Sequence, residues 1–101
     1  MRTNSMTVKS AEKVLKVLKA LRGYSLQGVS NRELAIKLDE SPSQITRALQ
    51  TLVSEGLAKR NENDLYTLGT AVVQIAKAHE SEMERAKARI EEIEQRTRVV
   101  F

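Results

Sequence analysis

The sequence predicts a mostly α-helical fold with three short helices, one β-hairpin and a long C-terminal helix. Only 3% of the 101 residues are aromatic, so Leu, Ile, Val and Ala must fill the interior. Those aliphatic residues recur at helical spacing through most of the chain. The length suits one domain with a single core, and 30% charged residues provide a solvated surface.

Composition also excludes several classes of function. The chain has no Cys and one His, so we expect no disulfide, no thiolate nucleophile, no metal site and no cofactor. No run approaches the roughly 18–20 apolar residues that span a bilayer, and residues 1–10 do not resemble a secretory signal. We therefore expect a cytoplasmic protein without a membrane partner.

The first helix is expected over residues 10–22, after a flexible N-terminus of residues 1–9. Gly23 is placed to end this helix in the left-handed conformation, and residues 24–29 form a loop. The apolar positions with spacings of three and four residues define its inward stripe. They are Ala11, Val14, Leu15, Leu18 and Leu21.

Two further helices follow in close succession. Ser30 precedes Glu33 by three residues, which is typical of a helix N-terminus, and Leu34, Ala35 and Leu38 form the stripe of this second helix. Ser41 and Pro42 start the third helix, which runs to about Glu55 before Gly56. Its predicted inward residues are Ile45, Leu49, Leu52 and Val53.

Residues 57–68 read as a β-hairpin, because two short strand-like runs flank Asn61-Glu62-Asn63-Asp64. Two helices separated by a few polar residues form a helix-turn-helix, whose second helix commonly enters the major groove of DNA. A hairpin directly after that motif makes residues 10–69 a winged helix-turn-helix domain.

The charge distribution points to a polyanionic partner. Residues 1–60 carry eleven basic and five acidic side chains, whereas residues 61–101 carry six and eight. A basic surface that neutralises phosphates releases counterions and favours DNA binding. The alternative is that the lysines of the first helix only form its solvated face; they are Lys9, Lys13, Lys16 and Lys19.

From residue 10 to about residue 73 the chain resembles the DNA-binding domain of the IclR family of bacterial transcription regulators. The resemblance rests on the order and spacing of short motifs. These are Glu33-Leu34-Ala35, Ser43 with Arg47 and Leu49, Thr51-Leu52, Glu55-Gly56-Leu57 and Tyr66-Thr67-Leu68-Gly69. The resemblance implies a transcription regulator that binds double-stranded DNA.

The wing departs from the family pattern. Asp64 stands where the family usually has Gly, and Glu62 lies beside it, so the wing tip is acidic. Carboxylates repel phosphates, so we expect Lys59 or Arg60 at the strand end, and not the tip, to contact the backbone. We expect no counterpart of the family's effector-binding domain after the last helix.

The last helix is expected over residues 70–98, followed by a tail of residues 99–101, because this stretch contains no Pro and no Gly. A heptad seam of alternating four- and three-residue spacings predicts a coiled-coil homodimer. In a parallel coil, Glu82 would face Lys87 and Arg89 would face Glu94. The seam residues are Val72, Ala76, His79, Met83, Ala86, Ile90, Ile93 and Thr97.

The sequence therefore predicts a sequence-specific regulator, a homodimeric repressor without a sensor domain. Arg47 suits guanine and Gln44 suits adenine in bidentate contacts, whereas Ser43 and Thr46 suit bases or phosphates equally. The alternative is a protein-interaction module, while nothing indicates an enzyme. The DNA-facing candidates are Ser43, Gln44, Thr46, Arg47, Gln50, Lys59 and Arg60.

Overall fold

The computed structural model describes residues 6–99. Residues 1–5 and 100–101, which include much of the expected flexible N-terminus and tail, lie outside the described residues. The elements are α1 (Lys9–Ala20), α2 (Asn31–Leu38), α3 (Pro42–Ser54), β1 (Ala58–Arg60), β2 (Tyr66–Leu68) and α4 (Thr70–Val99). This order confirms the predicted winged helix-turn-helix with a long C-terminal helix.

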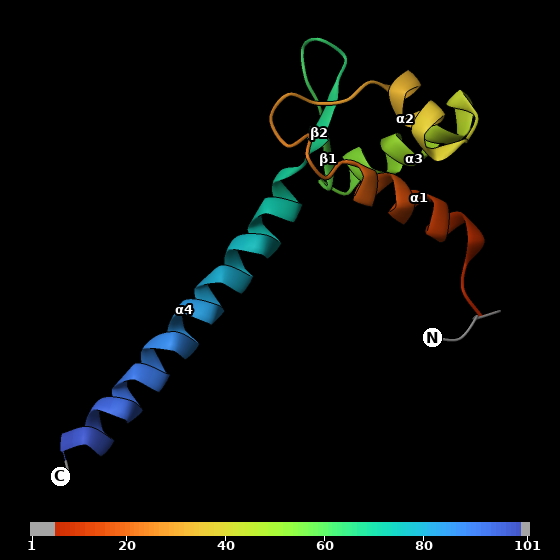
Figure 1. Cartoon of the computed structure of the whole chain (residues 1–101). Helices are drawn as coiled ribbons and strands as arrows, with labels where there is room; N and C mark the ends of the chain where they lie inside the picture. Colours follow the sequence, from red (N-terminus) through yellow and green to blue (C-terminus); the bar gives the residue numbers. More distant parts are fainter. Residues whose placement is uncertain (1–5, 100–101) are drawn as a thin grey trace.

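The three short helices and the hairpin gather into one small domain, from which α4 projects as a single rod (Figure 1). Thirty residues at about 1.5 Å each make α4 roughly 45 Å long. Only its first turn touches the domain, because Ala71 and Val72 are half-buried whereas every residue from Val73 to Arg98 is exposed.

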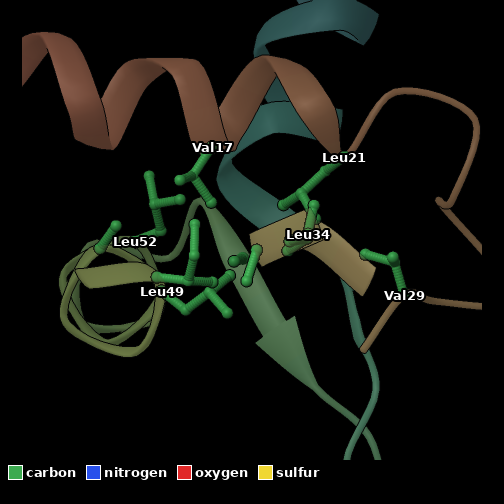
Figure 2. Packing of buried hydrophobic residues seen from close by; sticks show 10 residues of the cluster. Val17, Leu21, Val29, Leu34, Leu49 and Leu52 are labelled. Carbon is green, nitrogen blue, oxygen red and sulfur yellow. The ribbon is translucent and has the colours of Figure 1, made fainter. Parts of the chain in front are cut away.

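The core lies where α1 crosses α2 and α3 above the hairpin. Val17 of α1 points toward Leu49 and Leu52 of α3, and Leu21 of α1 lies beside Leu34 of α2 (Figure 2). Val29, Ala35, Ile45, Ala48 and Ala58 complete the set of buried hydrophobic residues. The core therefore joins all three helices to the base of the wing.

The buried face of α1 is rotated by part of a helical turn from the apolar stripe that the sequence predicted. Val17, which it omitted, is buried, whereas Leu15 is 51% exposed. The helix also begins one residue earlier and ends two residues earlier than predicted, at Ala20. Similarly, Val53 of α3 is exposed and Ala48 takes the inward position, because α1 packs along the Ala48 side of α3.

The N-terminal caps of α2 and α3 and the glycine after α3 were predicted correctly. The Ser30 hydroxyl accepts a hydrogen bond from the Glu33 backbone N–H, and the Ser41 hydroxyl accepts one from the Gln44 N–H. Each bond satisfies a backbone donor that a helix N-terminus would otherwise leave unpaired. Gly56 follows α3 with a φ of 77°, as its placement predicted.

The wing is a short antiparallel hairpin in which Ala58 pairs with Leu68 and Arg60 with Tyr66. Val29 pairs with the outer side of the second strand, because its backbone exchanges two hydrogen bonds with the backbone of Tyr66. The chain segment between α1 and α2 is thereby tied to the wing. The wing base is consequently fixed relative to the helix-turn-helix.

Candidate nucleic-acid interface

The buried and exposed faces of α3 separate sharply. Ile45, Ala48, Leu49 and Leu52 are buried against the rest of the domain. Four of the five predicted DNA-facing residues of α3 are exposed, and Thr46 is half-buried. The exposed ones are Ser43, Gln44, Arg47 and Gln50.

Arg47 and Gln50 form no side-chain hydrogen bond or ion pair with other residues in the part of the chain that the structure describes. An arginine offers five donors in a rigid fork, and a glutamine offers both a donor and an acceptor. These are the side-chain groups that match base edges in the major groove. The Ser43 hydroxyl lies 3.3 Å from that of Ser41, close to the start of α3.

Gln44 is held by α1. The Lys13 ammonium donates a hydrogen bond of 3.1 Å to Gln44 Oε1 and lies 3.7 Å from the carboxylate of Glu40. Glu40 belongs to the turn between α2 and α3, so one lysine links the first helix to the turn and to the second helix of the helix-turn-helix motif. Sequence reasoning missed this link because 31 residues separate Lys13 from Gln44.

Thr46 is engaged inside the protein. Its hydroxyl donates to the backbone carbonyl of Pro42 at 3.0 Å and accepts from the side-chain amide of Asn31 at 2.6 Å. Asn31 begins α2, so this pair clamps the two helices of the motif together. The structure thus places Thr46 in a structural hydrogen bond, and it adds Asn31, which sequence reasoning missed, to the residues that shape this surface.

A groove of about 450 Å³ runs between the start of α1 and the outer face of α3. Its basic residues are Lys9 and Lys13 from α1 and Arg47 from α3. Ser10, Val14, Gln44, Ala48 and Thr51 line the remainder. The groove brings the basic face of α1 beside the exposed face of α3, which the sequence alone did not establish.

Hydrogen bonds and an ion pair within the loop fix the conformation of the wing tip. The Asn61 side chain accepts hydrogen bonds from the backbone N–H groups of Asn63 and Leu65, and Asp64 takes the left-handed conformation with a φ of 61°. The Asp64 carboxylate accepts from Arg60 Nη2 at 2.8 Å and from Arg60 Nε at 3.1 Å. Arg60 is therefore partly neutralised, whereas Lys59 is exposed without an ion pair among the described residues.

Val72 at the start of the seam is half-buried against the domain, whereas the rest of the seam of α4 is open to solvent in the single chain. Met83, Ile90 and Ile93 are 48–56% exposed. Val73 and Ile75, which the predicted seam omitted, flank it near the domain and are also exposed.

The described residues contain no group of three or more His, Asp or Glu side chains placed to hold a metal ion. Within residues 6–99 there is also no helix apolar enough over a sufficient length to cross a bilayer.

Comparison with known protein families identifies the family of this domain. The IclR helix-turn-helix domain matches residues 10–62, which is more than half of the chain. The chain belongs to the IclR helix-turn-helix family. This is a family of DNA-binding transcription regulators and not of enzymes, in agreement with the prediction.

Solved IclR-type structures share the fold. HmgR of Pseudomonas aeruginosa is 31% identical with a TM-score of 0.68, over 76% of this chain and 33% of that one. An IclR family transcriptional regulator from Brucella abortus shares the fold at 21% identity and a TM-score of 0.63, over 80% and 31% of the two chains. The present chain thus spans about a third of each of these IclR-type proteins.

The chain is also similar to a further solved protein. ZitR of Lactococcus lactis is 26% identical with a TM-score of 0.54, over 90% of this chain and 61% of that one. A search of curated proteins gives no significant match.

Proposed function

We propose that this IclR-type chain is a sequence-specific transcriptional regulator that binds double-stranded DNA as a homodimer. The observation that carries the proposal is the exposed polar face of α3 beside the basic groove of α1. An α-helix presented in this way fits the major groove, while flanking cations meet the phosphates.

Arg47 and Gln50 are proposed to read base edges. Both are exposed on α3 and lie three residues apart, so they project from neighbouring turns of one helix face. Arg47 suits the two acceptors of guanine, and Gln50 suits adenine. Ser43 is proposed to contact DNA at the start of α3, and Lys9 and Lys59 to contact phosphates on either side.

Homodimerisation through α4 is the second part of the proposal. The seam leaves three large side chains half exposed, and a second copy of the helix would bury them. In a parallel coil, Glu82 and Lys87 are complementary, as are Arg89 and Glu94. Such a dimer presents two α3 helices to two half-sites, so the second contact becomes intramolecular.

We propose repression as the regulatory outcome. A DNA-bound dimer blocks access to a promoter without any further contact, whereas activation requires a surface that recruits another protein. The competing function is a protein-interaction module, which the acidic wing tip favours because Glu62 and Asp64 repel phosphates.

The test is a titration of the chain with random duplex DNA at several salt concentrations, followed by selection of bound sequences. DNA binding predicts that log affinity falls linearly with log salt, by about 0.9 for each neutralised phosphate. The selection is expected to enrich a palindromic motif. Absence of binding at low salt would refute the proposal and leave the interaction module as the better explanation.

A further inference from the structure

We propose that Lys13 sets the base preference of Gln44, so that Gln44 selects guanine and not adenine. This inference rests on the proposed function, because it assumes that α3 lies in the major groove. It replaces the expectation from sequence that Gln44 pairs with adenine.

The geometry around Gln44 is specific. Lys13 Nζ lies 3.1 Å from Gln44 Oε1. An ammonium group has only donors, so the atom that faces it must be the amide oxygen. Glu40 lies 3.7 Å away from the same ammonium and keeps it over the turn between α2 and α3. The amide oxygen of Gln44 is thereby engaged before DNA is bound.

The position of Gln44 makes this bond relevant to DNA reading. Gln44 is the third residue of α3, and the N-terminal residues of a recognition helix are those that contact base edges. Lys13 and Gln44 also line one small hollow of about 40 Å³ together with Val17 and Ile45. The stems of the two polar side chains therefore lie over the same part of the core.

The chemical consequence follows from the hydrogen-bonding patterns of the bases. A glutamine that recognises adenine uses its oxygen to accept from N6 and its nitrogen to donate to N7. Lys13 donates to one of the two lone pairs of the amide oxygen, and its positive charge disfavours the approach of the N6–H donor of adenine to the other, whereas the N–H donors of Gln44 stay available. Guanine presents two acceptors, O6 and N7, and the nearby ammonium favours the same acceptors. Lys13 is thus a positioning residue that acts through Gln44.

The experiment compares the DNA sequences that the full chain and its variants select from a randomised duplex pool. The variants are Lys13→Met, Gln44→Ala and the double substitution, with Lys16→Met as the charge-matched control. Lys16 lines the same hollow one turn further along α1. Circular dichroism verifies that each variant is folded, and titration of single-base operator variants measures the preference.

The expected result is that one base pair of the selected motif changes from guanine to adenine in Lys13→Met. The change in preference should be on the order of tenfold, the usual scale for a bidentate base contact. Lys16→Met should keep guanine, and Lys13→Met should have no effect on base preference when Gln44 is already Ala.

Two outcomes would overturn the inference alone. In the first, Lys13→Met weakens binding to every sequence equally, reduces the salt dependence and keeps the motif, which would make Lys13 a phosphate contact. In the second, Gln44→Ala leaves every position of the motif unchanged. A wild-type chain that enriches no motif would instead refute the proposed function itself.

Discussion

The wing offers a substitution that separates charge from backbone geometry. Asp64 pairs with Arg60 and takes the left-handed conformation, with a φ of 61°. Asn has nearly the same size and tolerates this conformation, so Asp64→Asn removes the carboxylate charge while the turn is kept. Arg60 is then free to contact a phosphate.

The size of the effect follows from the number of phosphates gained. One further phosphate contact steepens the slope of log affinity against log salt by about 0.9. Between about 50 and 200 mM salt, Asp64→Asn should therefore lose roughly threefold more affinity than the wild-type chain. Folding should hardly change, because Arg60 and Asp64 are 59% and 74% exposed and such pairs contribute at most about 1 kcal/mol.

Fluorescence anisotropy on a random duplex measures both slopes. Glu62→Gln is the matched control, since it removes one negative charge from the same tip, and Glu62 has no ion pair within the described residues. A steeper slope in Asp64→Asn alone supports a phosphate contact by Arg60. Identical slopes in the two variants would mean that only the net charge matters and that Arg60 does not reach the DNA.

Three further predictions address α3, α4 and the junction between the wing and α4. Arg47→Ala should cost about 1–3 kcal/mol on the selected site and relax preference at one base pair, whereas an equal loss on random DNA would indicate a phosphate contact. Truncation after Ala78 should leave a folded, mostly monomeric domain with a weak preference for palindromes; a dimer in sedimentation would contradict the role of α4. Gly69→Ala places its Cβ 2.1 Å from the Gly56 carbonyl oxygen. It should therefore lower the free energy of unfolding by about 2–4 kcal/mol in urea titrations, and a loss below about 1 kcal/mol would refute the steric argument.

The features that the sequence predicted well are local ones. The two N-terminal caps depend on a hydroxyl three residues from its backbone donor, so Ser30 and Ser41 could be recognised directly. The turn after α3 needs a residue with positive φ, which Gly56 supplies. The order of these signals then predicted the arrangement of helices and wing, because short connections leave few alternatives.

The features that escaped prediction depend on contacts between distant segments. Aliphatic periodicity gives α1 a broad apolar stripe, but only packing against α3 decides that Val17 is buried and Leu15 is exposed. The partners of Gln44 and Thr46 come from α1 and α2, respectively. Neither pair has a sequence signature, since each requires the tertiary arrangement of two helices.

These internal contacts divide the proposed DNA-binding residues into two kinds. Gln44, Thr46 and Arg60 already have polar partners in the free protein, so a DNA contact by Thr46 or Arg60 replaces an internal hydrogen bond, whereas Gln44 keeps its bond to Lys13. Exchange adds little net affinity, although it can set which base is accepted. Arg47 and Gln50 have no such partners among the described side chains, so their base contacts replace only hydrogen bonds to water and break none within the protein, at a cost in the entropy of ordering a flexible side chain. Substitutions at Arg47 and Gln50 should therefore lower affinity most, whereas substitutions at Gln44 and its partner Lys13 should change selectivity more than affinity.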